Sequence, residues 1–296
     1  MSTPQNRSAL RDNVKSRNHP SQILLRAIGH ILVFCAVCIS LTPLIWLFFL
    51  TFKSNNEILL YPMVMPDSLD FSNYIEAFRR VPYSTMVGNT GFILLVTIPL
   101  SLTFSIMSAF AISRMRFGSG RLQNAVYSYF ISGIILPVFV LLFPVYLIMV
   151  RTGLYNSLWA VIFPLIGWAA PLNMLILVGA FRSVPASLEE AAVLDGCSVP
   201  RILINIFVPI MKPAISTVFI LNFLSVWNDF ALSKTVLMNP DLRTLSLAAI
   251  LFRGEYSKDY GLIAAGVFIL ILPQIVIFAF FQRFIIEGIS AGAVKG

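Results

Sequence analysis

Charged residues are scarce in this chain of 296 amino acids. They make up 11% of the sequence, whereas hydrophobic residues make up 58% and the mean hydropathy is +0.85. Soluble domains usually carry about 25% charged residues. The composition therefore excludes an ordinary soluble domain and indicates a protein that lies in a lipid bilayer.

Cysteine and histidine are also rare, with three cysteines (Cys35, Cys38, Cys197) and two histidines (His19, His30). Their spacing fits neither a metal site nor a disulfide framework, and we interpret the cysteines as small buried hydrophobic residues. The G-x-x-x-x-G-K-[S/T] signature of a phosphate-binding loop does not occur. We therefore expect no metal, no cofactor bound by this chain and no enzymatic activity.

Long apolar segments fill most of the chain. A membrane span takes about 20 apolar residues, and six segments meet that length. The predicted fold is an all-α polytopic membrane protein with six transmembrane helices, over residues 27–51, 87–112, 123–150, 158–180, 213–234 and 260–281. Prolines recur in nearly every span and can kink the helices. They fit ordinary membrane-helix composition and transporter hinges equally well.

Polar segments flank the predicted transmembrane domain of residues 23–281. Residues 1–22 are predicted to be a disordered tail, and residues 282–296 form a short second tail. Six spans place both termini on one side, and segments on that side carry about 13 Lys and Arg against about 8 on the other. The bias predicts cytoplasmic termini. It also explains the net charge of +8 without nucleic acid as a partner.

A polar insert, residues 181–212, separates the fourth span from the fifth and lies on the cytoplasmic side in this topology. Ser187 stands three residues before Glu190, the spacing of a capping box at a helix start. Gly196 suits a residue just past a helix end, where φ is positive. Ser198 and Pro200 suit the start of a second helix. The insert is therefore predicted to form a hairpin of two short helices within residues 185–209.

The first helix of this hairpin favours a protein partner. Leu188, Ala191, Ala192 and Asp195 share a face at helical spacing. A helix lying on the membrane surface would need basic residues and bulky anchors, whereas this helix carries acidic residues and no base. We therefore predict docking to a soluble protein.

The residues Glu190-Ala191-Ala192-x-x-Asp195-Gly196, followed by Ile206-x-Val208-Pro209, resemble the EAA loop of bacterial ABC-importer permease subunits. Asn89-Thr90, Pro185 and Trp227-Asn228-x-Phe230 are similar to the maltose-type (MalG-like) carbohydrate branch. The C-terminal segment from Gln282 to Gly296 resembles the tail of that branch. Val208 stands where Leu is commoner in the family.

This resemblance implies a set of partners in the bacterial inner membrane. An ABC ATPase dimer would bind ATP and Mg²⁺ and receive the EAA loop. A second, homologous permease subunit would complete the pathway, and a periplasmic or extracellular sugar-binding protein would deliver the sugar. The residues implied at the ATPase are Glu190, Ala191, Ala192, Asp195 and Gly196 in the loop, and Gln282, Glu287, Gly288 and Lys295 in the tail.

Polar residues in the fifth predicted span have two readings. They are Asn222, Ser225, Trp227, Asn228 and Asp229. They could line a sugar path, because polar groups inside a span usually face water or the bundle interior. They could instead serve helix–helix hydrogen bonding, with Asp229 at the external interface. The stripe Thr97, Ser101, Ser105 and Ser108 in the second span favours a packing seam.

Two other functions compete with an ATP-driven importer. An ion-coupled secondary transporter could use Asp229, but it predicts inverted repeats with broken helices, and no clear repeat is found. A membrane enzyme would need a cluster of His, Cys or Asp, or a nucleophile with its base, within the spans. The sequence offers neither, so we favour the importer permease.

Overall fold

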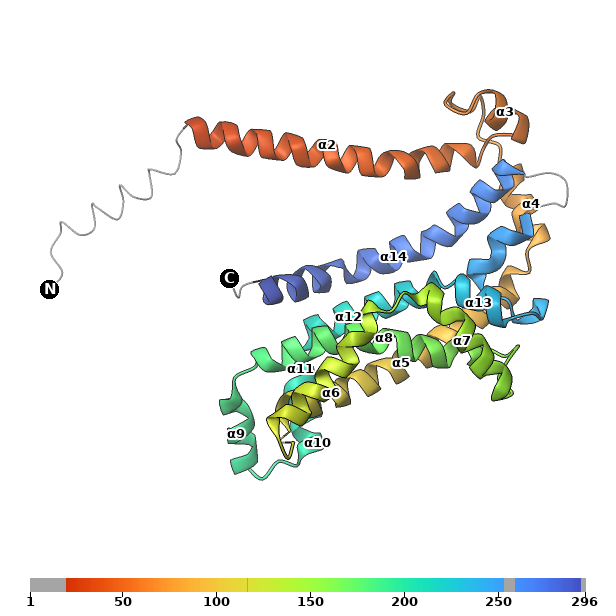
Figure 1. Ribbon diagram of the computed structural model, residues 1–296. Helices are drawn as coiled ribbons and strands as arrows, with labels where there is room; N and C mark the ends of the chain where they lie inside the picture. Colours follow the sequence, from red (N-terminus) through yellow and green to blue (C-terminus); the bar gives the residue numbers. More distant parts are fainter. Residues whose placement is uncertain (1–19, 116, 253–258, 294–296) are drawn as a thin grey trace.

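The computed structural model describes residues 20–115, 117–252 and 259–293, and these residues form helices and connecting turns (Figure 1). Within these ranges four helices are long and apolar enough to cross a membrane alone. They are α2 (Pro20–Leu50), α5 (Tyr83–Arg114), α8 (Trp159–Ser183) and α14 (Tyr260–Ala293). The shorter elements are α3 (Asn55–Leu60), α4 (Ser72–Arg80), α6 (Gly120–Ser132), η1 (Gly133–Ile135), α7 (Val138–Arg151), α9 (Ala186–Leu194), α10 (Val199–Ile202), η2 (Leu203–Phe207), α11 (Val208–Ile210), α12 (Lys212–Trp227), α13 (Ala231–Val236), η3 (Pro240–Leu242) and η4 (Leu245–Phe252).

The third predicted span is not one helix. A bend of 104° separates residues 120–135 from α7. Pro137 stands at the break as the N-cap of α7. A proline donates no backbone hydrogen bond and restricts the residue before it, so the helix stops before Pro137 and starts again in a new direction.

The fifth predicted span, residues 213–234, is also interrupted. Helix α12 ends at Trp227, and α13 begins only at Ala231. On its other side, a bend of 81° at Met211 separates α12 from residues 199–210. The described residues thus hold four spans, or up to six if each bent pair counts as one.

A polar seam joins the central helices. Ser101 and Ser105 of α5 are buried, and the Asn173 side chain of α8 donates to both hydroxyls at 3.1 Å. Asn222 of α12 reaches Ser101 at 3.4 Å. Thr97 is buried in the same row. The hydroxyl stripe is therefore a packing seam, as its spacing indicates, and it holds α5, α8 and α12 together.

Helix α2 lies apart from this bundle and meets it through α14 (Figure 1). None of its apolar 18-residue window is buried. Cys35 and Cys38 lie in this helix and are exposed, so the prediction of buried cysteines is wrong for both; Cys197 is half-buried. The contact with α14 is close at Gly261, where a Cβ would stand 2.6 Å from the Lys53 carbonyl oxygen.

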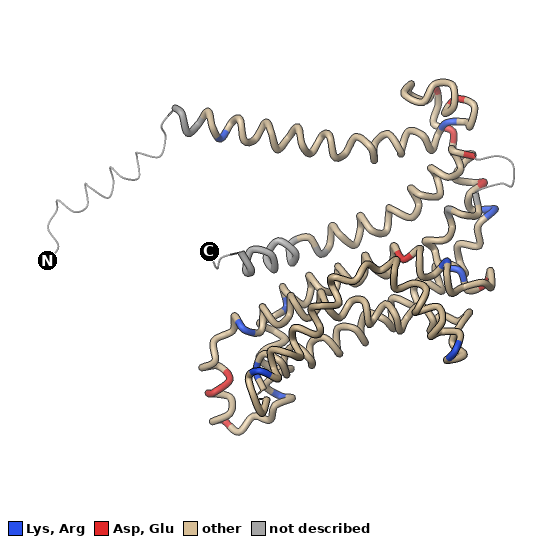
Figure 2. The backbone as a smooth tube through the Cα atoms, viewed as in Figure 1, with Lys and Arg blue, Asp and Glu red and all other residues tan. Residues whose placement is uncertain are grey.

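The charges gather toward the two ends of the helices, with a mostly uncharged stretch between them (Figure 2). The α9–α10 turn lies at the same end as the start of α2, while α3, α4 and α13 lie at the opposite end (Figure 1). This separation is what a bilayer requires of a bundle that crosses it.

The predicted N-terminal tail is too long by three residues, and the predicted C-terminal tail is largely helical. Helix α2 begins at Pro20, so residues 20–22 are helical, and residues 1–19 lie outside the described residues. Helix α14 continues to Ala293, so the tail residues Gln282, Glu287 and Gly288 lie in a continuation of that helix. Lys295 lies outside the described residues.

Candidate functional site: the hairpin between α8 and α12

The hairpin begins at Pro185. Pro185 is the N-cap of α9, with φ −58° and ψ 136°, and no side chain caps this helix. The predicted capping box of Ser187 and Glu190 is therefore wrong. Because Pro185 ends the extended connection, the helix starts at Ala186. Ser187 and Glu190 both lie exposed within this helix.

The turn between the two short helices follows the prediction. Gly196 has φ +75°, a conformation that favours glycine. The Cys197 N–H donates to the Ala192 carbonyl at 2.9 Å, and the Gly196 N–H donates to the Val193 carbonyl at 3.0 Å. This pattern is the Schellman motif. Ser198 is the N-cap of α10, with Pro200 in the first turn, although the serine side chain makes no capping bond.

Three of the four residues of the predicted α9 face, Leu188, Ala191 and Asp195, are exposed, and the fourth, Ala192, is not. Ala192 is only 6% exposed and packs into the core with Phe181 and Phe207, so it points away from a partner. Exposed residues surround it on the outer side of the turn. They are Glu190, Ala191, Asp195 and Gly196 of the predicted loop, and Val193 and Leu194, which the face assignment missed.

Leu194 is the most exposed of these, at 88%, and Val193 is 59% exposed. Two apolar side chains thus stand exposed between the acidic residues Glu190 and Asp195 at one end of the bundle. We call Glu190, Ala191, Val193, Leu194, Asp195 and Gly196 the hairpin tip.

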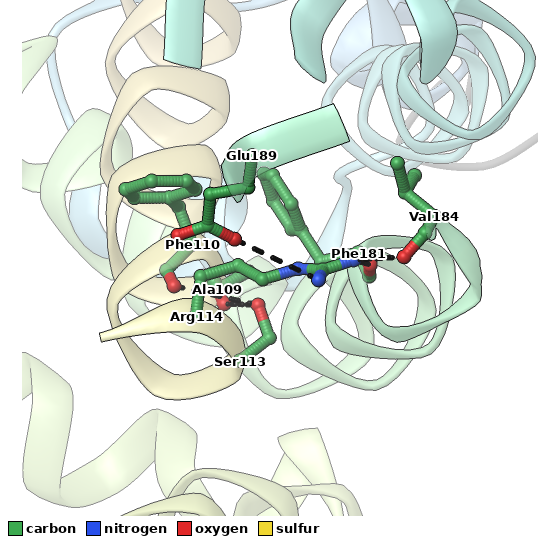
Figure 3. A network of polar contacts seen from close by, with 7 residues as sticks. All are labelled: Ala109, Phe110, Ser113, Arg114, Phe181, Val184 and Glu189. Atoms are coloured by element: carbon green, nitrogen blue, oxygen red, sulfur yellow. Dashed lines mark hydrogen bonds and ion pairs between the residues drawn. The ribbon is translucent and has the colours of Figure 1, made fainter. Parts of the chain in front are cut away.

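Arg114 ties the hairpin to the membrane helices (Figure 3). It is the last residue of α5, and its side chain is 9% exposed. The guanidinium donates to the carbonyls of Phe181 and Val184 at the end of α8. Its Nη1 lies 3.7 Å from Glu189 Oε2 on α9. One side chain thus contacts two other helices, in a position where the helix C-terminus favours a cation.

Aromatic packing surrounds this arginine. The Arg114 Cζ lies 5.0 Å from the centroid of the Phe207 ring. Phe110, Phe181 and Phe207 form a triangle of rings whose centroids are 5.4–5.6 Å apart. A guanidinium stacked on an aromatic face is shielded from water, which strengthens its polar contacts. The sequence alone marked Arg114 only as part of a basic turn, but an arginine at the last residue of a span was the available signal.

The polar residues of the fifth predicted span do not share one face. Asn222 is buried in the seam, whereas Ser225 and Asn228 are exposed. The Trp227 ring stacks on Phe223 at 5.5 Å, and its Nε1 donates to the Leu270 carbonyl at 3.2 Å. The indole is therefore engaged in packing against its own chain.

Asp229 lies beyond the end of α12 and caps the start of α13. Its carboxylate accepts from the Leu232 N–H at 3.3 Å and from the Ser233 N–H and hydroxyl at 3.0 and 2.8 Å. Its own carbonyl accepts from Ser246 at 2.6 Å. Asp229 therefore holds three segments in place where the helix is interrupted. No group of three or more His, Cys, Asp or Glu residues in the described ranges is placed to hold a metal.

The fold and the hairpin define a class: a helical membrane protein with an exposed helical hairpin at one end of its bundle and no assembled metal site in its described part. A family model described as "Binding-protein-dependent transport system inner membrane component" matches residues 101–289. The chain belongs to this family of transport components, and it is a multi-pass protein of the inner membrane.

Relatives agree with this assignment. The chain is 34% identical over 259 residues to a putative ABC transporter permease protein, ORF2, of Caldicellulosiruptor sp. (86% of this chain, 91% of that one). It is 31% identical over 257 residues to the sulfoquinovosyl glycerol transport system permease protein SmoH of Agrobacterium fabrum (86% and 89%). It is also 31% identical over 259 residues to the trehalose transport system permease protein SugB of Mycobacterium tuberculosis (87% and 93%).

Solved structures share the fold. A chain in the crystal structure of a bacterial ABC transporter involved in the import of the acidic polysaccharide alginate superposes with a TM-score of 0.75 at 22% identity. The match covers 90% of this chain and 99% of that one.

Proposed function

We propose that this chain is a transmembrane permease subunit of an ATP-binding-cassette importer that moves a sugar or oligosaccharide across the inner membrane. Relatives named as permeases for trehalose and for sulfoquinovosyl glycerol support a sugar substrate. The hairpin tip is the observation that carries the proposal. It presents Val193 and Leu194 to solvent beside Glu190 and Asp195, on a helix fixed to the membrane bundle.

In this proposal the hairpin tip docks into a cleft of a separate ABC ATPase. The ATPase dimer, and not this chain, holds ATP and Mg²⁺. When ATP binding moves the ATPase, the displacement of α9 passes through Glu189 and Arg114 to α5 and α8. Arg114 belongs to α5, and its guanidinium contacts both Glu189 and the carbonyls at the end of α8. The tail residues Gln282, Glu287, Gly288 and Lys295 would provide a second contact with the ATPase.

The proposed topology has six spans, with each bent pair counted as one, and both termini in the cytoplasm. The EAA hairpin then lies between spans four and five on the cytoplasmic side. A second, homologous permease subunit would pair with this chain, and a sugar-binding protein would dock at the opposite end. Of the predicted path residues, Ser225 and Asn228 remain at the surface of the chain and are the ones we assign to the sugar path.

An ion-coupled mechanism through Asp229 finds less support. Both of its carboxylate oxygens accept hydrogen bonds from α13. Protonation in a transport cycle would remove acceptors that hold this helix start in place.

A single exchange tests the docking proposal. Leu194→Asp places a charge in the centre of the hairpin tip, and we expect the permease to lose co-purification with its ATPase and ATP-dependent uptake. Leu194 is 88% exposed, so the exchange should change the free energy of unfolding of the chain very little.

Leu59→Asp is the matched control, because Leu59 is 59% exposed and belongs to α3, the helix that lies at the opposite end of the molecule (Figure 1). It should leave the complex intact. An L194D variant that still co-purifies with the ATPase and transports at the wild-type rate would contradict the docking role.

A further inference from the structure

The interruption after α12 lies where a bilayer tolerates little irregular backbone. Residues 228–230 connect α12 to α13 and do not form a helix that continues either one. Non-helical backbone at membrane depth occurs where it is buried in protein or lines a water-filled cavity. Part of the hydrogen bonding of this connection is made within the chain. The Ser246 hydroxyl donates to the Asp229 carbonyl, and the Asp229 carboxylate accepts from the Ser233 N–H.

Asn228 begins the interruption, and its side chain is exposed. It forms a reciprocal pair with Gln274 of α14: Asn228 Nδ2 donates to Gln274 Oε1 at 3.2 Å, and Gln274 Nε2 donates to Asn228 Oδ1 at 3.1 Å. Gln274 lies well inside the candidate span of residues 260–280. Ser225 stands one turn earlier on the exposed side of α12.

One exposed amide, Asn228, and one half-buried amide, Gln274, do not suit contact with lipid. Polar side chains within spans face the bundle interior or water, because hydrocarbon offers them no partners. The surface that carries Ser225, Asn228 and Gln274 therefore faces an aqueous space rather than acyl chains.

The hydrogen bonds already made by the pair define what it can still bind. Asn228 Nδ2 also donates to the Leu224 carbonyl at 3.0 Å, and Gln274 Nε2 also reaches the Leu270 carbonyl at 3.4 Å. Each NH₂ group has two donors, so both are engaged. Each amide oxygen has two lone pairs and receives one bond from its partner. The pair thus offers two fixed acceptors, which suit ligands rich in hydroxyl donors.

We infer that Asn228 and Gln274 form a carbohydrate-contacting subsite on this chain, in which the two amide oxygens accept hydrogen bonds from hydroxyls of the sugar in transit. The inference rests on the proposed importer function. It adds Gln274, which no sequence pattern marked, and it gives the interruption of α12 a purpose: the break brings an amide to the water-facing surface. Asn222 belongs to the seam and takes no part.

Water access is the first test. In the assembled transporter, with Cys35, Cys38 and Cys197 each replaced by serine, Ser225→Cys and Gln274→Cys are treated with a charged, membrane-impermeant methanethiosulfonate. Leu272→Cys and Val276→Cys are matched controls, because these exposed residues lie on nearly the opposite face of α14. We expect the two polar positions to react at least tenfold faster. Equal, slow labelling at all four positions would overturn the inference.

Uptake is the second test. Gln274→Met and Asn228→Leu keep side-chain size and remove the acceptor. Radiolabelled trehalose, melibiose and raffinose serve as the panel, and KM is measured for a sugar that the wild-type transporter takes up. Loss of a sugar hydrogen bond should raise KM about tenfold, with ATPase co-purification unchanged. The variant N222L, in the seam, should lower yield or stability without a selective rise in KM.

The outcomes separate the two proposals. If the wild-type transporter takes up no panel sugar in an ATP-dependent manner, the proposed importer function fails for these sugars. If the wild type transports and Q274M and N228L keep its KM, the subsite alone is wrong.

Discussion

Arg114 shows how much one side chain can join at the end of a span. Its guanidinium caps the carbonyl end of α8, faces the carboxylate of Glu189 and lies on the ring of Phe207. Nη1 and Nη2 of the planar guanidinium reach Glu189 and the two carbonyls together, whereas the single ammonium of a lysine cannot reproduce this fork. The residue therefore fixes both the position and the orientation of α9.

Replacing Arg114 should separate the hairpin from the membrane helices. Charge-assisted hydrogen bonds contribute about 1.5–3 kcal/mol each, so Arg114→Ala should lower the free energy of unfolding by about 2–3 kcal/mol and reduce the sugar transported per ATP hydrolysed. Arg114→Lys should retain part of the stability and less of the coupling. Denaturation in detergent and the uptake-to-ATPase ratio measure the two effects.

Arg121→Ala is the control, because Arg121 is exposed in the first turn of α6. Unchanged coupling in R114A would refute the role of Arg114 as a link.

Gly196 tests the turn itself. Its φ of +75° costs a side-chain-bearing residue about 1–2 kcal/mol, so Gly196→Val should distort the hairpin tip and weaken ATPase co-purification. Gly118→Val is matched in residue type: a Cβ on Gly118 meets no atom within 4 Å, and its φ is not in the left-handed region. Equal co-purification of G196V and G118V would contradict the prediction.

At the scale of elements, the α5–α8 pair is held by a polar seam within an apolar interface. Asn173 satisfies two serine hydroxyls at once, and the buried position leaves these groups no water as an alternative. Such bonds hold the two helices together, because separating them would leave the buried amide without a partner.

Asn173→Leu should loosen this alignment. Hydrogen bonds between membrane helices contribute about 0.6 kcal/mol on average and at most about 1.7, so we expect a loss of about 1 kcal/mol in unfolding free energy. A double-mutant cycle with Ser105→Ala measures the pairwise part. A coupling energy of zero would show that the seam adds no stability through this pair.

How far the sequence predicts these elements depends on the physical signal. Hydropathy located the four long helices, although α2 begins seven residues before and α14 ends twelve residues after the predicted span. The glycine signal at Gly196 and the N-cap signal at Ser198 located the hairpin turn, because both depend on local chemistry. The breaks at Pro137 and after Trp227 were missed, since an apolar run reads as continuous whichever way it bends. Arg114 and Gln274 were missed because their partners lie far away along the chain.

At the scale of the molecule, the hairpin tip and the start of α2 lie at one end, and α3, α4 and α13 lie at the other (Figure 1). The pattern predicts the outcome of reporter fusions. Alkaline phosphatase, active only outside the cytoplasm, should be inactive when fused after Gly118 or Gly196 and active after Asn156 or Asn239. Activity after Gly196 would place the hairpin outside and overturn the proposed topology.

Helix α2 has a consequence for how the protein is made. None of its apolar window is buried, and its contact with the bundle comes through α14, at the far end of the sequence. The ribosome delivers α2 first and α14 last, so the first helix has to be stable in lipid by its own hydrophobicity for the whole time of synthesis. Its mean hydropathy of 2.5 meets that demand. Membrane insertion of this chain can therefore begin long before its tertiary structure exists.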